Sequence, residues 1–463
     1  MSREPKDRFV RFESGASCDS RLTTHDSRLL PLFSPAAPDR PIAFRDGAPV
    51  LLEEFQRHVA AIVERLPAGA YMINLCDDRY RFLTAYAAAA IAGHTVLLPS
   101  SRAEQIVVEV ETAHPGSYRF DDVMVEAAMS DHSPEPSTQS PGIPADHTVM
   151  VGFTSGSTGE PKRFPKLWRS VYASNARNLA AIRGALGCDE LTTPWVLATV
   201  PPQHMYGMEL SVLLPLIGGV AVHSGRPLFP ADVAQALKES PQPRVLVSTP
   251  VHLRAVVDSS VHFPHVDLII SATAPLDQTL AAAVERKLGG QLLEMFGSTE
   301  TCVFAARCTA VENAWRIYEG VVLTPGPDGT LVTAPWFIEP VMLQDVVELQ
   351  GDDRFTVVGR NTDLIEVAGK RASLGDLTRR LLAIEGVRDA IVFQPESDAV
   401  ATIRRVAALV VAPGLSAAKI LERLAPSVDP AFMPRPLVIV ASLPRNEVGK
   451  LPRERLLQAL HPG

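Results

Sequence analysis

The pattern of hydrophobic and polar positions divides the N-terminal part of the chain into short apolar runs and longer helical stretches. The apolar runs are rich in leucine and β-branched residues, and turn residues bound each of them. They are GAYMINLC at 69–76, HTVLLP at 94–99, HTVMVGF at 147–153, WVLATV at 195–200, VAVHS at 220–224, RVLVSTP at 244–250 and VDLIISA at 266–272. Stretches at helical spacing, such as 167–186 and 276–288, separate the later runs. This alternation is typical of an α/β domain with a mostly parallel sheet.

Two segments require separate interpretation. The window FLTAYAAAAIAGHTVLLP at 82–99 has the length of a membrane span, but it is carried by alanine and holds a glycine and a histidine. We expect a buried helix that runs into a strand, and no membrane span. The stretch SDHSPEPSTQSPGIPADH at 130–147 is rich in proline and serine, which predicts a surface loop inside the large domain.

Beyond residue 315 the pattern changes to strands without long helices, RIYEGVVLTP, GTLVTAP and PVMLQDVVEL, and this predicts a small antiparallel subdomain. After FTVVGR the chain alternates strands with two helices, the first capped by Ser373, and it ends in a short final helix. The predicted fold is α/β: a large multi-layered N-terminal domain at 1–359 with mostly parallel sheets, and a smaller mobile α+β domain at 360–463. We expect the boundary between Gly359 and Asp363.

Composition narrows the class of protein. The chain has 463 residues, 46% of them hydrophobic and 21% charged, with a formal net charge of -8. These values are those of an ordinary globular protein, and they give no reason to expect a nucleic-acid partner. The five cysteines show no CxxC spacing, which argues against a disulfide framework or a zinc site. The N-terminal residues MSREPKDRFVRFESG lack the apolar core of a secretory signal, so we expect a cytoplasmic protein.

The stretch FTSGSTGEPKRFP at 153–165 carries the first chemical signal. Glycines allow successive backbone N–H groups to converge on one point, hydroxyls add donors, and Lys162 adds a full charge, so the stretch can bind phosphate oxygens. Its spacing differs from that of a Walker A loop. On composition alone, a solvated Ser/Gly turn is the more common explanation of such a stretch.

The order of residues favours the phosphate loop. TSGSTGEPK at 154–162 matches, residue for residue, the phosphate-binding signature of the adenylate-forming enzymes, the superfamily of acyl- and aryl-CoA ligases, luciferases and peptide-synthetase adenylation domains. Later segments resemble further motifs of this family in the family's order. They are TVPPQHMYGMELSVLLPLIGG at 199–219, SATAPLDQTL at 271–280, EMFGSTET at 294–301, LQDVVEL at 343–349, VVGRNTDLIEVAGKR at 357–371 and LPRNEVGKLPRERL at 443–456. The resemblance covers residues 154–453 and, with the alternating N-terminal region, effectively the whole chain.

The resemblance implies a role for each segment. The ATP-binding residues would be Thr154, Ser155, Gly156, Ser157, Thr158, Gly159, Lys162, Ala272, Thr273, Phe296, Gly297, Thr299, Asp345, Arg360 and Lys450. The acyl pocket would include His204, Tyr206 and Met295. The catalytic residues would be Lys450, His204, Thr299 and Glu300, with Glu300 also holding Mg²⁺, a cation that prefers hard oxygen ligands.

The sequence departs from the family's pattern at several positions. Ala272 and Thr273 stand where glycine and alanine are more usual, and Phe296 replaces the more common tyrosine. Near the expected hinge, Gln344 replaces a glycine, Thr362 stands where many relatives carry Asp or Lys, and Glu366 replaces a frequent lysine. The hinge motif therefore departs furthest from the family's pattern.

The implied activity has two steps. ATP and Mg²⁺ first convert a small aryl or acyl carboxylic acid to an acyl-adenylate with loss of pyrophosphate, and a thiol of CoA or of carrier-protein phosphopantetheine then takes the acyl group. No carrier motif of the GxDSL type occurs in the chain, so the acceptor is external. The compact length resembles stand-alone ligases of bacterial aromatic-polyene pigment pathways. Two other hypotheses stay open: a catalytically weak nucleotide-binding or scaffold protein, and a phosphotransferase that would release ADP instead of AMP.

Overall fold

The computed structural model describes residues 29–130, 140–154, 162–189, 192–326, 329–360, 364–367, 370–395, 406–446, 449 and 451–460. The chain divides into two compact units, Met1–Val321 with Ala334–Glu339, and Val322–Thr333 with Pro340–Gly463. The domain boundary expected near residue 359 falls within strand β21 (Arg354–Arg360), and it stays a prediction.

A large sheet forms the centre of the first unit. Within that unit its strands follow the order β16-β15-β14-β13-β12-β10-β11-β2-β3. Their bounds are β2 (Pro41–Arg45), β3 (Ala48–Leu51), β10 (Trp195–Ala198), β11 (Ala221–His223), β12 (Arg244–Ser248), β13 (Leu268–Ser271), β14 (Gln291–Ser298), β15 (Cys302–Arg307) and β16 (Trp315–Ile317). The pairs from β14 through β13, β12, β10 and β11 to β2 are all parallel, which confirms the predicted mostly parallel sheet.

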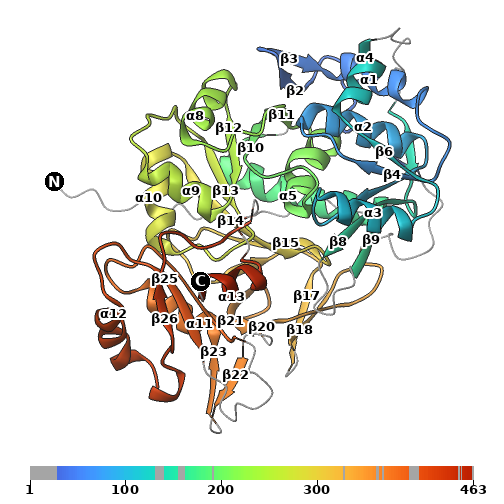
Figure 1. The fold of residues 1–463 in the computed structure, drawn as a ribbon. Helices are drawn as coiled ribbons and strands as arrows, with labels where there is room; N and C mark the ends of the chain where they lie inside the picture. Colours follow the sequence, from blue (N-terminus) through green and yellow to red (C-terminus); the bar gives the residue numbers. More distant parts are fainter. Residues whose placement is uncertain are drawn as a thin grey trace. The chain divides into compact units, whose positions relative to one another are not determined.

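Both faces of this sheet are buried, as a parallel sheet requires. Alternate residues of β10, β12, β13 and β14, among them Leu197 and Ile269, pack under helices α8 (Pro230–Glu239), α9 (Pro250–Asp258) and α10 (Gln278–Leu288) (Figure 1). The intervening residues, among them Val196 and Ile270, belong to the main core with α5 (Trp168–Leu186), α6 (Met205–Met208), the π-helix Glu209–Leu213 and α7 (Leu214–Ile217). The predicted helices at 167–186 and 276–288 are therefore present almost to the residue.

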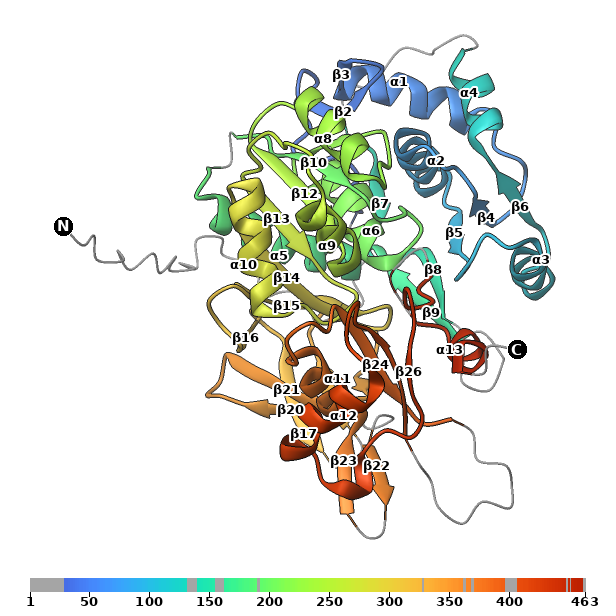
Figure 2. The same cartoon turned by 60° about the vertical axis from the view of Figure 1, so that its left-hand side comes forward.

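A second sheet of the first unit has the order β6-β4-β5-β8-β9. Its bounds are β4 (Tyr71–Asn74), β5 (Thr95–Leu98), β6 (Ser117–Phe120), β8 (Thr148–Thr154) and β9 (Lys162–Leu167). Helix α2 (Arg79–Ile91) contacts both this sheet and the large one, while α3 (Glu104–Ala113) packs on the opposite face of the smaller sheet (Figure 2). Helices α1 (Leu52–Val63) and α4 (Asp122–Ser130) pack against α2.

The structure shows which elements the segments at 82–99 and 130–147 form. Residues 82–99 form most of the buried helix α2 and then strand β5, as predicted. Among the residues with described positions, no helix has the length and apolar character needed to cross a membrane. Part of the predicted loop at 130–147 forms β7 (Gly142–Pro144), which pairs antiparallel with β1 (Leu29–Pro31).

Among its described residues, the second unit contains short strands and three α-helices. Its strands are β17 (Val322–Gly326), β18 (Gly329–Thr333), β19 (Val341–Leu343), β20 (Asp345–Leu349), β21, β22 (Leu364–Val367), β23 (Lys370–Ser373), β24 (Asp389–Phe393), β25 (Ala407–Val411) and β26 (Leu437–Ile439). The sheet β17-β18-β19 is the predicted antiparallel subdomain. Helices α11 (Leu374–Leu382) and α12 (Ala417–Leu424) cover one face of β24-β25-β26, and α13 (Arg453–Leu460) packs on the other.

Local sequence signals predicted the start of helix α11 but not the hairpin of β22 and β23. The Ser373 side chain accepts a hydrogen bond from the N–H of Asp376, so the predicted N-cap of α11 is confirmed. The sequence predicted a single strand between FTVVGR and the helix at Ser373, and the structure has the antiparallel hairpin β22–β23 there.

Candidate active site

Strands β8 and β9 form a hairpin at the base of the predicted phosphate loop. They pair antiparallel, and Thr154 lies opposite Lys162. The loop residues Ser155, Gly156, Ser157, Thr158 and Gly159 lie outside the described residues. Lys162 is exposed at the start of β9. The hairpin thus brings the two ends of the predicted loop together at one edge of the smaller sheet.

The turn between β14 and β15 carries Thr299 and Glu300. It is closed by Ser298 and Thr301, since each residue's N–H donates to the other's hydroxyl oxygen, at 3.1 and 3.3 Å. Just before the turn, a Cβ atom built at Gly297 would lie 2.2 Å from the carbonyl oxygen of Cys302. Only glycine therefore allows the close approach of the two strands at this bulge. Gly297 therefore has a structural role, and its role in ATP binding stays a prediction.

The hairpin and the turn meet. A Cβ atom built at Gly152 of β8 would lie 2.9 Å from the Cγ2 methyl of Thr299 and 3.4 Å from the Cε methyl of Met205. Met205 follows His204 directly and opens α6. Three segments that are far apart in the sequence, the phosphate-loop hairpin, the His204 segment and the Thr299 turn, therefore converge on the end of β8.

The functional groups of the turn are available to a ligand. Within the described part of the chain, the Thr299 hydroxyl has no hydrogen-bond partner and the half-buried Glu300 carboxylate has no cationic partner. No group of three or more potential metal ligands occurs among these residues. A single uncommitted carboxylate fits Mg²⁺, because this cation takes one or two protein carboxylates and completes its shell with water and phosphate oxygens.

The predicted adenine side shows an aromatic cluster and a strained residue. The ring of Phe296 lies edge-on to Phe304, with centroids 5.4 Å apart, and 5.0 Å from the ring of Trp315. Ala272 is buried at the end of β13. The next residue, Thr273, has φ of 80°, which is a rare conformation for a β-branched residue. Strain of this kind concentrates at functional sites and costs about 1–3 kcal/mol.

The predicted acyl-pocket residues differ in how far they are buried. His204 is the half-buried N-cap residue of α6. Tyr206 is buried, and its hydroxyl donates to the main-chain carbonyls of Ser248 and Ile270, at 3.2 and 3.1 Å. Burial raises the pKa of the Tyr206 phenol well above its ordinary value. Met295 is buried in the main core.

Arg79 was not among the site residues predicted from the sequence. In the structure its side chain binds residues on both sides of His204 in the sequence. Its guanidinium is fully buried and donates to the carbonyl oxygens of Ala198 and Val200, at 2.9 and 2.7 Å, and to the hydroxyl of Ser211. These acceptors flank His204 on both sides in the sequence. Burial lowers the pKa of Arg79 to about 9. The only signal in the sequence was an arginine at the start of an alanine-rich helix.

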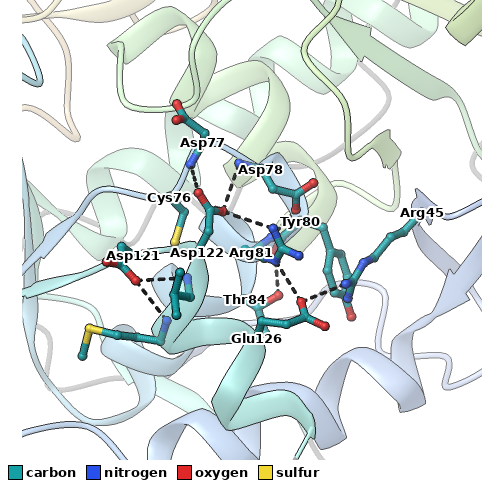
Figure 3. A network of polar contacts seen from close by, with 12 residues as sticks. Arg45, Cys76, Asp77, Asp78, Tyr80, Arg81, Thr84, Asp121, Asp122 and Glu126 are labelled. Carbon is teal, nitrogen blue, oxygen red and sulfur yellow. Dashed lines mark hydrogen bonds and ion pairs between the residues drawn. The ribbon is translucent and has the colours of Figure 1, made fainter.

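A polar network fixes the start of α2 and therefore Arg79. The Asp122 carboxylate of α4 accepts the N–H groups of Asp77 and Asp78, at 2.7 and 3.1 Å (Figure 3). Arg81 of α2 donates to Glu126 of α4 at 2.9 Å. Each charged group in this network is matched by protein partners, so we interpret it as structural.

The second unit holds the remaining predicted residues. Asp345 at the start of β20 lies directly opposite Arg360 at the end of β21, so the two predicted ribose contacts are cross-strand neighbours. Lys450 lies outside the described residues. The residue before it, Gly449, accepts a hydrogen bond at 2.9 Å from Arg445, whose guanidinium also pairs with Asp389 at 2.8 Å.

Comparisons with known proteins agree with this arrangement. The family described as AMP-binding enzyme matches residues 65–328. The 4-coumarate–CoA ligase of Halorhodospira halophila is 30% identical over 66% of this chain and 76% of its own length. The 3,4-dihydroxybenzoate–[aryl-carrier protein] ligase of Bacillus anthracis is 21% identical over 67% of this chain and 74% of its own. The o-succinylbenzoate CoA synthetase of Bacillus subtilis, solved with its acyl-adenylate intermediate, superposes with a TM-score of 0.74 at 17% identity, over 91% of this chain and 96% of that one.

The matched stretch contains the phosphate-loop hairpin, the His204 segment and the Thr299 turn, the three segments that converge in the structure. The likeness to the solved structure confirms the predicted α/β fold of adenylate-forming enzymes. The ligases that match in sequence support the activity of an AMP-forming acid–thiol ligase, which uses ATP. This chain belongs to the family of AMP-binding enzymes.

Proposed function

We propose that this ligase activates a small aryl or acyl carboxylic acid and passes it to an external thiol, either CoA or the phosphopantetheine of a carrier protein. The observation that supports the proposal is the meeting of Gly152, Thr299 and Met205, which belong to the segments predicted to bind phosphate and to border the acyl pocket. Relatives that act on 4-coumarate and on 3,4-dihydroxybenzoate favour an aromatic acid. We further propose a role in bacterial aromatic-polyene or related secondary metabolism, in the cytoplasm.

In the first half-reaction a carboxylate oxygen attacks the α-phosphorus of ATP, the bond from this phosphorus to the bridging oxygen breaks, and pyrophosphate leaves. The loop at 154–162 would hold the β- and γ-phosphates, and the Thr299 hydroxyl would donate to the α-phosphate. Glu300 would hold Mg²⁺, which when bound neutralises phosphate oxygens. Asp345 and Arg360 would hold the ribose, as their cross-strand pairing permits.

Two anions meet in this step, so their repulsion must be offset in the transition state. Lys450 would supply the positive charge at the attacking and α-phosphate oxygens. Phe296, Ala272 and Thr273 would line the adenine, and His204, with Tyr206 and Met295, would border the acid. In the second half-reaction the thiol sulfur attacks the acyl carbon, its proton is lost, and AMP leaves with the bridging oxygen.

The test is a screen of ATP–pyrophosphate exchange with 4-coumarate, benzoate, 3,4-dihydroxybenzoate, 2-succinylbenzoate and malonate, each offered separately. We expect exchange that depends on one class of acid, followed by thioester formation with CoA or with a phosphopantetheinylated carrier protein. ATP binding without exchange on any acid would favour the catalytically weak nucleotide-binding protein. Release of ADP would favour the phosphotransferase. Either result would reject the proposal.

A further inference from the structure

Two buried charged side chains outside the predicted site hold the Thr299–Thr301 turn. The first is Lys166 of β9, which is only 6% exposed although it is a lysine. Its ammonium donates to the main-chain carbonyl oxygen of Glu300, at 2.5 Å. Lysine is rarely buried unless its charge is used, so this contact needs an explanation beyond packing.

The second is Glu209, the first residue of the π-helix that follows α6, which is 1% exposed. Its carboxylate accepts the N–H of Val303 at 3.1 Å, and it also accepts hydrogen bonds from Ser174 and Asn178, both at 3.0 Å. Burial raises the pKa of this carboxyl group, and these hydrogen bonds together with the charge of Lys166 oppose the rise. Glu209 is thus a buried carboxyl group that accepts hydrogen bonds from three residues.

One of these contacts lies within the turn, and the other lies just after it. Lys166 binds the carbonyl of Glu300 within the turn, and Glu209 binds the N–H of Val303 just after it, on β15. Lys166 belongs to the strand that follows the phosphate loop, while Glu209 belongs to the helix that follows His204. Each contact therefore ties the turn to one of the other two segments of the candidate site.

We propose that Lys166 and Glu209 are positioning residues for adenylate formation, which fix the turn so that Thr299 and Glu300 face the phosphates that the neighbouring hairpin binds. The proposal rests on the proposed roles of Thr299 and Glu300. A π-helix is a rare element that is frequent at functional sites, and here it lies between α6 and α7 and places a carboxylate against the N–H of Val303. Neither residue needs to touch the substrate, so the effect passes through the main chain of the turn.

The experiment uses the full chain with Lys166→Met, which keeps the length of the side chain and removes its charge and donors. ATP–pyrophosphate exchange is measured with the best acid of the panel as a function of Mg²⁺ concentration, and MgATP binding is measured by calorimetry. We expect kcat to fall about 10- to 100-fold, because a misplacement of about 1 Å has that effect, and the required Mg²⁺ concentration to rise. The KM for the acid should change little.

Two comparisons separate positioning from simple loss of stability. Lys287→Met is the matched control, because Lys287 also donates to a main-chain carbonyl, that of Ser259 at 2.8 Å, but it lies on α10 outside the candidate site. It should keep wild-type kcat and Mg²⁺ dependence. Lys166→Arg, which restores a cation and its donors, should recover part of the lost kcat.

A folded Lys166→Met variant with wild-type kcat and Mg²⁺ dependence would overturn the proposal. If that variant does not fold, Glu209→Met decides by the same measurements, since it keeps the length of the side chain but removes the acceptor for the N–H of Val303. Wild-type kcat and Mg²⁺ dependence in a folded Glu209→Met variant would then overturn it. Absence of exchange in the wild-type protein with every acid would instead reject the proposed function, so the two failures are distinguishable.

Discussion

Gly152→Ala tests the convergence on which the candidate site depends. The added methyl group would lie 2.9 Å from Cγ2 of Thr299, about 0.5 Å inside the 3.4 Å at which ordinary contact begins. The Met205 methyl, at 3.4 Å, is the end of a flexible side chain and can yield. Thr299 lies on a closed turn, so we expect the clash to displace its hydroxyl from its proposed position at the α-phosphate and to cost about 1–3 kcal/mol of overpacking.

Since about 1 Å of misplacement can slow a reaction about 100-fold, a shift of half that size should lower kcat about 10-fold. Exchange kinetics measure this, with thermal unfolding as the check on folding. Thr299→Ser removes the clashing methyl and keeps the hydroxyl, so in that background Gly152→Ala should cost only about 2-fold. Gly375→Ala is the control, because its new methyl would lie 3.5 Å from the nearest atom, on Ser373. Full activity of Gly152→Ala, or an equal loss in both backgrounds, would refute the reasoning.

Three further variants test other parts of the account. Thr273→Gly relieves a φ of 80°, and after the entropy cost of glycine it should raise the free energy of unfolding by about 1 kcal/mol, while a decrease in urea titrations would contradict the inferred strain. Tyr206→Phe removes a donor to two main-chain carbonyls and should lower the free energy of unfolding by about 1–2 kcal/mol; an unchanged urea midpoint would speak against those bonds. Asp389→Asn weakens the ion pair of Arg445, the residue that holds the turn before Lys450, so kcat for exchange should fall about 3- to 10-fold with MgATP affinity unchanged. Wild-type kcat would show that this ion pair does not position the lysine.

Much of the fold could be predicted because its signals are local. Apolar runs, turn residues and the Ser373 N-cap each depend on a few neighbouring positions, and the structure confirms them. The motif segments are contiguous as well, so their order alone indicated the family. Between FTVVGR and the helix at Ser373 the sequence predicted a single strand, and the structure has the hairpin β22–β23.

The contacts that support the site could not be predicted in the same way. Lys166 lies in a short strand with other basic residues and looks like a solvated charge until the strand is placed beside Glu300, 134 positions later. Glu209 left one faint signal, a lone carboxylate in a long apolar run. Arg79 is similar, because its acceptors lie more than a hundred residues away in the sequence. Tertiary packing determines these partners, and periodicity carries no information about it.

The central claim is that the acid becomes an AMP ester on this protein, and isotope transfer tests it most directly. The acid that is active in exchange is prepared with ¹⁸O in its carboxylate and incubated with the protein, ATP, Mg²⁺ and the thiol acceptor. The account predicts one ¹⁸O atom in the phosphate of the AMP, because the attacking carboxylate oxygen stays with phosphorus when the thiol displaces AMP. AMP without ¹⁸O, or ADP as the product, would contradict it.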